Sequence, residues 1–168
     1  PEIQSDLYYL SIPYGHKFPE DVKAARDKAG QISTVYTCCA EAFPNTFTFS
    51  DPAEAAWMSY YSAKDHLDGY LRWAYNSWPK EPLLDSRFEA WAGGDTYLVY
   101  PGARSSIRFE KLIEGVQAHE KITILRKEFT DKKNKTGFKK LEKMLSTFNL
   151  RDFPEVPAAE TVNKANKI

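Results

Sequence analysis

Three stretches of the chain carry the continuous hydrophobic pattern of buried strands. Residues 3–13 contain an apolar run from Leu7 to Leu10, residues 31–39 are rich in β-branched side chains, and residues 69–74 mix aromatic and aliphatic ones. Strands of a parallel sheet are covered on both faces, so they lack the regular alternation of apolar and polar positions. The pattern therefore predicts three parallel strands.

The segments between these strands have the pattern of helices. Residues 19–30 open with an acidic pair and end at a glycine, as helices commonly do. A second helix is expected to begin at Asp51, which can cap it, with Pro52 in the first turn and Glu54 completing a capping box. We expect this helix to end near His66. The order is then β-α-β-α-β, with connections long enough for parallel crossovers.

After the third strand the chain continues through a loop into a long helix. Residues 79–94 contain two prolines and two glycines and are predicted to be a loop, and residues 95–100 to be a short extended segment. Ser105 or Ser106 is expected to cap a helix with an apolar side that ends near Phe129.

The final segment predicts a helical extension. After a charged break at residues 131–135, apolar residues recur at helical spacing, and the weakly patterned tail after Pro154 is expected to be mobile. We therefore divide the chain into a barrel portion, residues 1–130, and a helical C-terminal extension, residues 131–168. The apolar stripe consists of Phe138, Leu141, Leu145 and Phe148.

Three βα units are too few to close a (β/α)₈ barrel, which needs eight of them in about 250 residues. An open three-stranded parallel sheet with apolar faces would leave its edges exposed. The predicted fold class is therefore α/β, a partial (β/α)₈ TIM barrel with parallel strands followed by helices. The missing part of the barrel, or a second copy of the chain, is expected to complete it. Because the sequence opens at Pro1, almost directly on a strand, we expect a fragment or a processed product.

The composition narrows the range of partners. The 168 residues include 23 basic and 23 acidic ones, and a neutral chain gives no support for a nucleic-acid or anionic-membrane partner. No apolar run approaches the roughly 20 residues of a membrane span. Aromatic residues make up 14% of the chain, with ten Tyr and four Trp. Tyr and Trp suit surfaces that need an apolar face and a polar edge, as sugar sites do.

The sequence predicts no metal site, no cofactor and no catalytic residue. The three histidines are scattered, and no GxGxxG, P-loop or GxSxG pattern occurs. Glu20-Asp21 is the only adjacent acidic pair and has the position of a helix start. The neighbouring Cys38 and Cys39 are interpreted as two small buried residues, and because neighbours on a strand point to opposite faces, no ordinary disulfide is expected between them.

The candidate binding residues lie where the strands end, because function in α/β barrels is found at the carboxyl ends of strands. The richest such region is GYLRWAYNSWP, residues 69–79, whose aromatic side chains either stack on a sugar or pack the core. Tyr36 is either a core or a pocket residue, and Asp85 is either a ligand contact or a cap. The candidate substrate-binding residues are Tyr36, Trp73, Tyr75, Asn76, Trp78 and Asp85.

Two charged residues near this region have structural interpretations. Arg72 is predicted to pair with a carboxylate as a strut, because it lies within an otherwise apolar strand. Asp95 follows two glycines, so it has either a turn role or a substrate role.

The run DGYLRWAYNSWPKEPLLDSRFEAWAGGDTYLVYPG, followed by SSIRFEKLIEG, resembles the C-terminal end of the catalytic domain of glycoside hydrolase family 123. The earlier segments DLYYLSIP and VYTCCAEAFPNTF fit the same family, and the resemblance covers roughly residues 5–125. The family consists of β-N-acetylgalactosaminidase-type enzymes. The resemblance implies that the three strands are the last three of a TIM barrel.

The resemblance also implies a retaining, substrate-assisted mechanism, which is a recognised exception to the two-carboxylate scheme. The acetamido oxygen of the substrate attacks the anomeric carbon, an aspartate orients it, and an adjacent glutamate acts as general acid and base. This sequence contains no Asp-Glu dipeptide, so we expect the catalytic pair upstream of Pro1 and the chain alone to be inactive. Family members are commonly bacterial and exported, which makes an exported location the expectation.

Two other functions remain open at this stage. In the first, the whole protein has lost its catalytic pair, and the domain binds carbohydrate without cleaving it. Alternatively, the chain is a self-contained small α/β protein with a scaffold role.

Overall fold

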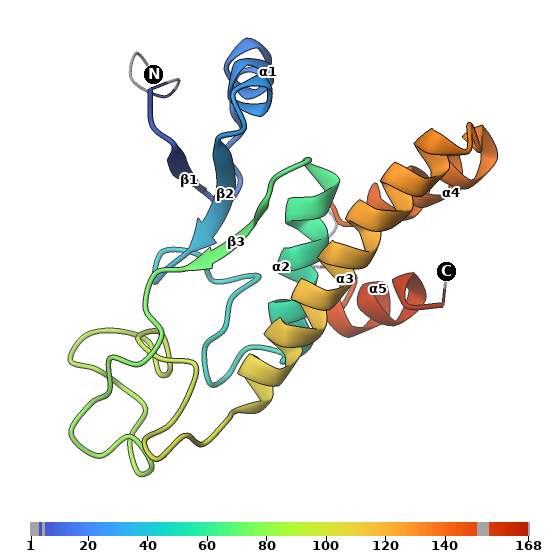
Figure 1. Ribbon diagram of the computed structural model, residues 1–168. Coiled ribbons are helices and arrows are strands. Elements are labelled where there is room, and N and C mark those ends of the chain that lie inside the picture. The colour runs from blue at the N-terminus through green and yellow to red at the C-terminus, as the bar shows by residue number, and fades with distance from the viewer. Residues whose placement is uncertain (1–3, 5, 151–154, 168) are drawn as a thin grey trace.

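The molecule divides into a small sheet, a group of helices beside it, and a layer of loops toward which the strands run (Figure 1). The computed structural model describes residue 4 and residues 6–150 and 155–167. The predicted first strand falls partly outside these residues, since positions 3 and 5 are not among them. Within this part of the chain no helix is long and apolar enough to cross a membrane.

Three strands form an open parallel sheet. Strands β1 (Tyr9–Pro13), β2 (Ile32–Thr37) and β3 (Gly69–Arg72) pair in the order β1-β2-β3, so that β1 and β3 are the edges. Helix α1 (Glu20–Lys28) connects the first two strands, and helix α2 (Ala53–Lys64) connects the second and third. This arrangement confirms the predicted β-α-β-α-β order and the α/β class. The first strand begins later than predicted, at Tyr9 rather than residue 3.

Helix α2 is the centre of the core. It contacts β3 on one side and the long helix α3 (Ile107–Asp131) on another, and every residue from Ala53 to Ala63 is buried. A helix that is buried on all sides has few charged residues, and the sequence AEAAWMSYYSAK has only Glu54 in its first turn and Lys64 at its end. The ring of Tyr60 stacks on Phe148 with centroids 4.5 Å apart, and Trp57 stacks on Tyr61 at 5.6 Å.

A glycine allows α2 and α3 to pack closely. A Cβ atom added at Gly115 of α3 would lie 2.8 Å from the Cα of Ala56 and 2.7 Å from the Oγ of Ser59. Real Cβ atoms do not approach other atoms so closely, so any larger residue would push the helices apart. Ser106, one of the two predicted caps, precedes the helix, and its Oγ accepts a hydrogen bond from the amide of Phe109.

The predicted C-terminal extension consists of two helices packed on this core. Helix α4 (Lys135–Leu145) carries the first three residues of the predicted apolar stripe, and Phe148 follows the end of the helix. Leu145 and Phe148 are completely buried. Helix α5 (Ala158–Ala165) packs against α2. Its buried residues are Ala158, Thr161, Val162 and Ala165. The expectation of a mobile tail is therefore wrong over α5, because small apolar residues there repeat at helical spacing and find a partner.

Two further expectations are corrected. Residues 95–100 form turns, with isolated bridges at Tyr97 and Tyr100, because buried side chains rather than a strand ladder hold this segment. The adjacent cysteines are not buried. Strand β2 ends before them, so that Cys38 is half-buried and Cys39 is exposed, both as free thiols.

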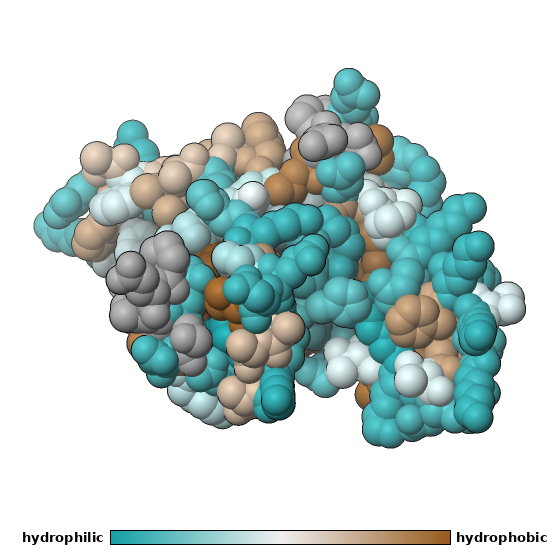
Figure 2. Space-filling model, turned by 90° about the horizontal axis from the view of Figure 1, so that it is seen from above, coloured by the Kyte–Doolittle hydropathy of each residue, from teal (hydrophilic) through white to brown (hydrophobic). Residues whose placement is uncertain are grey.

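The two faces of the sheet differ, because alternate residues of a strand point to opposite faces. On the face opposite the helices, Tyr9 keeps 45% and Leu71 38% of its surface exposed, and Tyr36 is half-buried between its partners on β1 and β3. Seen from above the view of Figure 1, the surface is mostly hydrophilic, with smaller hydrophobic areas between (Figure 2). The residues that pack against the helices are Leu10, Ile12, Val35 and Tyr70.

Candidate functional site

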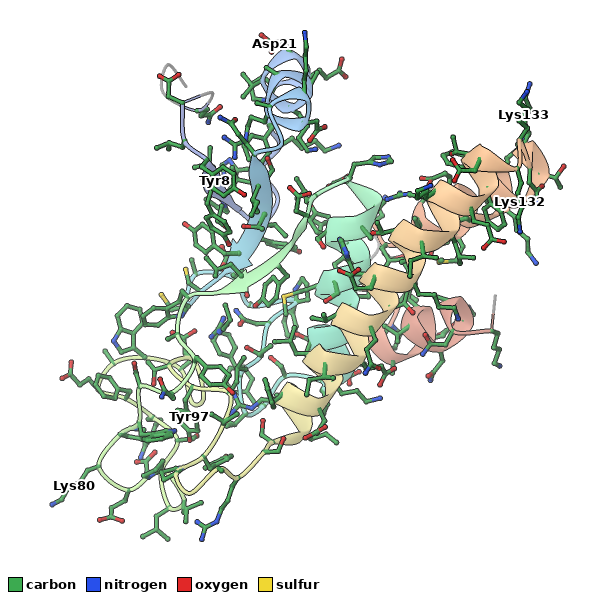
Figure 3. All side chains as sticks on the ribbon, viewed as in Figure 1. Tyr8, Asp21, Lys80, Tyr97, Lys132 and Lys133 are labelled. Atoms are coloured by element: carbon green, nitrogen blue, oxygen red, sulfur yellow. The ribbon has the colours of Figure 1, made fainter. Side chains whose placement is uncertain are left out.

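The carboxyl ends of β2 and β3 lead into a layer of irregular chain made of residues 38–51 and 73–106, which we call the loop layer (Figure 1). Tyr97 lies inside this layer and Lys80 at its outer tip (Figure 3). This is the end of the sheet at which parallel α/β folds place their ligands.

Two exposed tryptophans form a pair at the beginning of the loop layer. Trp73, directly after β3, is 41% exposed, and Trp91 is 38% exposed. Their ring centroids are 5.4 Å apart and their planes are inclined by 43°. The indole Nε1–H of Trp73 donates a hydrogen bond to Asp95 Oδ1 at 3.3 Å. Large exposed aromatic rings with fixed polar edges are suited to stack on the apolar face of a sugar.

The following candidates extend along the same segment. Tyr75 is 48% exposed and contacts the ring of Phe109 edge-on, with centroids 5.7 Å apart. Asn76 is exposed and forms an isolated antiparallel bridge with Tyr97. Trp78 donates from its Nε1 to the carbonyl oxygen of Val99 at 2.7 Å. Tyr75, Asn76 and Trp78 thus lie on one chain segment that starts at Trp73, with their backbones fixed by the turns of residues 96–99.

The remaining two candidates lie differently. Tyr36 is on β2, paired with Leu71 of β3, and shares the helix-free face of the sheet. Asp85 is exposed, and both of its carboxylate oxygens accept hydrogen bonds from Arg87. Nη2 of Arg87 donates to Oδ2 at 2.6 Å, and Nε donates to Oδ1 at 2.9 Å. These hydrogen bonds from Arg87 lower the pKa of Asp85 to about 2. The structure thus engages Asp85 with a neighbouring arginine.

A buried ion pair lies beneath the tryptophan pair. Nη2 of Arg72 donates to Oδ1 of Asp95 at 2.5 Å and to the backbone oxygen of Asp95 at 2.6 Å. Its Nη1 donates to Oδ1 of Asn45 at 2.9 Å and to the backbone oxygen of Thr37 at 3.2 Å. This confirms the predicted pairing of Arg72 with a carboxylate, and it gives Asp95 a structural partner within the turn.

A second buried arginine holds the loop layer from the helix side. Nη1 of Arg108, in the first turn of α3, donates to the backbone oxygens of Thr46, Gly94 and Tyr97 at 2.5, 2.9 and 3.0 Å. Its guanidinium also lies over the Tyr97 ring, 5.5 Å from the centroid. Burial lowers the pKa of Arg108, and burial raises that of the Tyr97 hydroxyl to about 12, with Tyr100 adding to the effect.

A buried carboxylate completes the support of the loop layer. Glu54, at the start of α2, accepts hydrogen bonds from the amides of Asn45 at 2.7 Å and Asp51 at 3.2 Å. Asp51 in turn accepts from the amide of Ala53 at 2.9 Å, which confirms the predicted capping box. Burial raises the pKa of Glu54 against the effect of these hydrogen bonds. The same residue therefore starts a helix and holds the loop that follows β2.

Exposed rings and hydrogen-bonded carboxylates lie side by side at the carboxyl end of the sheet. Among the described residues, no group of three or more His, Cys, Asp or Glu is placed to hold a metal ion. Three carboxylates in or beside the loop layer have partners: Asp95 binds Arg72, Asp85 binds Arg87, and Glu54 binds backbone amides. The exposed aromatic pair remains accessible beside them.

Comparison with known proteins now identifies the family. Residues 2–125 match the family described as glycoside hydrolase 123, catalytic domain. The chain belongs to glycoside hydrolase family 123. Among solved structures it is similar to a family 123 glycoside hydrolase from Clostridium perfringens, described in a study of glycolipid glycan hydrolysis, with a TM-score of 0.74 and 28% sequence identity. That match covers 87% of this chain and 26% of the other. No curated protein matches.

The candidate site of this family 123 chain contains residues that the sequence did not predict. Trp91 was not a candidate, although it forms the second ring of the pair. Arg108 lies in the predicted long helix and was not a candidate either. The adjacent glycines were a usable signal, since a Cβ atom on Gly94 would lie 2.6 Å from Nη1 of Arg108, and Gly94 has φ +78°. A backbone that requires glycine beside an arginine indicates a close approach.

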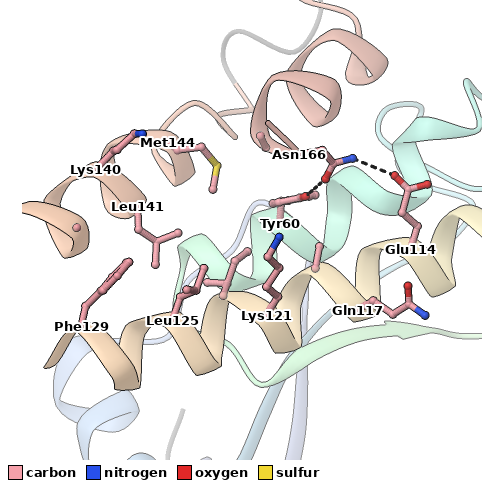
Figure 4. A pocket seen from close by; sticks show the side chains of 14 residues that line it. Tyr60, Glu114, Gln117, Lys121, Leu125, Phe129, Lys140, Leu141, Met144 and Asn166 are labelled. Atoms are coloured by element: carbon pink, nitrogen blue, oxygen red, sulfur yellow. Dashed lines mark hydrogen bonds between the residues drawn. The ribbon is translucent and has the colours of Figure 1, made fainter. Parts of the chain in front are cut away.

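A cavity of about 400 Å³ lies elsewhere in this family 123 chain, between α3, α4 and α5 (Figure 4). Leu125 of α3 and Leu141 of α4 line it. Tyr60 donates a hydrogen bond to Asn166, which donates to Glu114. The cavity is lined by helical residues on the side away from the strand ends, so it has no part in the candidate site.

Proposed function

We propose that this chain is the sugar-binding C-terminal part of a glycoside hydrolase that cleaves N-acetylhexosamine bonds, of the N-acetylgalactosamine type, by retaining, substrate-assisted catalysis. Membership of family 123 supports the activity. The observation that carries the binding role is the exposed, tilted pair of Trp73 and Trp91 at the carboxyl end of β3. Tyr36, Tyr75, Asn76, Trp78 and Asp85 are proposed as the surrounding contacts.

The proposed catalytic Asp-Glu pair belongs to a part of the protein outside these 168 residues. The sequence contains no Asp-Glu dipeptide, and the chain spans only 26% of the solved relative. We expect no hydrolysis of a chromogenic N-acetyl-β-galactosaminide by this chain alone, because positioning without a general acid does not cleave the bond. Clear turnover would contradict this assignment.

The remaining part of a TIM barrel is proposed to cover the helix-free face of the sheet. Tyr9 and Leu71 are exposed there, and β1 and β3 have unpaired edges in the described residues. We prefer the rest of the barrel to a second copy of the chain, because the solved relative is much longer than this chain. Sedimentation of the purified chain tests this choice: a monomer is expected, and a stable dimer would favour the second copy.

Binding is tested by NMR on the ¹⁵N-labelled chain. The four tryptophans give four indole N–H signals, which Trp→Phe variants assign. On titration with N-acetylgalactosamine, the Trp73 and Trp91 signals are expected to move, while that of Trp57, buried in α2, stays in place. Trp73→Ala should abolish the shifts, and Trp78→Phe, which retains a ring, should reduce them only slightly. No shift in the wild-type chain would contradict the binding role.

A further inference from the structure

Trp73 is an exposed ring that is anchored at one atom. Its surface is 41% exposed, yet its Nε1–H donates to Oδ1 of Asp95, a residue with no exposed surface. A tryptophan side chain turns about two bonds, and a hydrogen bond at the edge of the indole fixes both of them. The buried partner therefore determines the direction in which the exposed ring faces.

Asp95 has an unusual distribution of hydrogen bonds. Oδ1 accepts from Nη2 of Arg72 at 2.5 Å as well as from Trp73. Oδ2 is equally buried but has no hydrogen-bond partner among the described residues. Leaving a buried carboxylate oxygen unpaired costs free energy, and such groups in native proteins often serve a function. Arg72 and Trp73 thus both donate hydrogen bonds to the same carboxylate oxygen of Asp95.

The anchor is itself held rigidly. Arg72 uses its guanidinium to join the side chain and the backbone of Asp95 to Asn45 and Thr37, which come from the other strand end. A planar guanidinium with several fixed acceptors defines the position of each one. The carboxylate of Asp95 therefore cannot follow the ring if Trp73 turns.

We propose that Asp95 is a positioning residue for sugar recognition: it holds Trp73 at a fixed tilt to Trp91, so that the two rings present a preformed angled wall. This inference rests on the proposed function. The apolar face of the pyranose would stack on one ring and the methyl of its acetamido group would contact the other. Fixing a ring before binding removes an entropy cost of about 0.5–1.5 kcal/mol per side chain, which corresponds to about twofold to thirteenfold in affinity.

The first test concerns the free protein. In Asp95→Asn, the indole N–H signal of Trp73 is expected to move and broaden, because a neutral amide holds the N–H less firmly than a carboxylate. The signals of Trp57 and Trp78 should stay in place and show that the fold is intact. Asp85→Asn is the matched control, since Asp85 is a loop aspartate bonded to Arg87 and not to an indole. An unchanged Trp73 signal in Asp95→Asn would overturn the proposal.

The second test is a double-mutant cycle on the affinity for N-acetylgalactosamine. Asp95→Asn is expected to weaken binding about twofold to thirteenfold, and so is Trp73→Phe, which keeps an aromatic ring without the N–H. In the Trp73→Phe background, Asp95→Asn should have no further effect. Additive losses in the double variant would show that Asp95 acts by supporting the fold and would overturn the proposal.

The two proposals fail in different ways. If the wild-type chain does not bind the sugar, the proposed function fails, and the role of Asp95 in recognition fails with it. The ligand-free spectra would still show whether Asp95 anchors the ring. If wild-type chain binds and Asp95→Asn binds equally well, the proposed function stands and the positioning role is wrong.

Discussion

The loop layer and the helical core both bury aromatic residues, but they are held together by different forces. In the helices, every backbone amide and carbonyl of the interior is satisfied within its own segment, so the space between them is filled by apolar contacts such as Tyr60 against Phe148. The loop layer has no regular ladder, and its carbonyls need donors from elsewhere. Arg72 and Arg108 supply these donors. Irregular chain can be as fixed as a helix when side chains replace the missing ladder.

The four tryptophans report on the two regions separately. Trp57 lies in the helical core and is 1% exposed, whereas Trp73, Trp78 and Trp91 belong to the loop layer and are each about 40% exposed. One set of indole signals therefore follows the region held by apolar contacts, and the other follows the region held by hydrogen bonds. Each substitution below should affect one set before the other.

The largest effect is expected from Arg108→Ala. It leaves the buried carbonyls of Thr46, Gly94 and Tyr97 without their shared donor. Each unpaired carbonyl costs about 1–3 kcal/mol of stability, and this cost is smaller where water replaces the donor. We expect a loss of about 4 kcal/mol in the free energy of unfolding, measured by urea denaturation, with loop-layer signals lost first. The exposed Arg87→Ala is the control and should cost less than about 0.5 kcal/mol. Equal losses would mean that hydrogen bonding does not hold the loop layer.

Phe148→Ala should be the most damaging change in the helical core. The side chain has no exposed surface and contacts both Tyr60 and Trp57, so its removal leaves a cavity and is expected to cost about 3–4 kcal/mol. The signal of Trp57 should respond before those of the loop layer. Ile124→Ala, at an exposed position of α3, is the comparison and should cost less than about 1 kcal/mol. If the loop-layer signals change first, the two regions do not behave independently.

Gly115→Ala tests the close packing of α2 and α3 by adding a single methyl group. The helix propensity of alanine favours the change, but the Cβ atom would clash with backbone atoms of Ala56. We expect a net loss of about 2 kcal/mol in thermal or urea unfolding. Gly69→Ala, where an added Cβ meets no atom within 4 Å, should be nearly neutral. A stabilised Gly115→Ala protein would show that the helices can separate freely.

The smallest effect concerns pH. Burial raises the folded-state pKa of Glu54 above 4.5, so its protonated form favours the folded chain. Its contribution to stability is therefore present below pH 4.5 and is lost as the pH rises through the folded-state pKa. Glu54→Gln, which cannot titrate, should flatten this part of the pH dependence of urea unfolding. A wild-type curve with the same slope as the variant would contradict the raised pKa.

Local patterns predicted most of the regular elements. The apolar runs located all three strands, and Asp51, Glu54 and Ser106 marked helix starts through contacts that span only a few residues. Helix α5 was missed because its short pattern of small residues becomes visible only against the helix that covers it. The predicted division at residue 130 and the closed barrel remain predictions.

The site was harder to predict than the fold, because its contacts join distant parts of the chain. The need of Arg72 for a carboxylate was predictable from its place in an apolar strand, but its partner lies 23 residues away. Arg108 meets the carbonyl of Thr46 across 62 residues. The pairing of Trp91 with Trp73 could not be predicted, because the residues around a tryptophan in a loop do not show which distant ring it contacts.

Helix α3 has a mechanical consequence. It comprises 25 residues, which corresponds to a rod of about 37 Å. Near its start, Arg108 donates hydrogen bonds to backbone oxygens of the loop layer. Toward its other end, Arg126 binds Glu142 of α4 and the carbonyl oxygen of Ala63 in α2. A rod that is bonded near both ends fixes the separation of the parts it joins. Helix α3 therefore sets the spacing between the loop layer and the contact of α2 with α4.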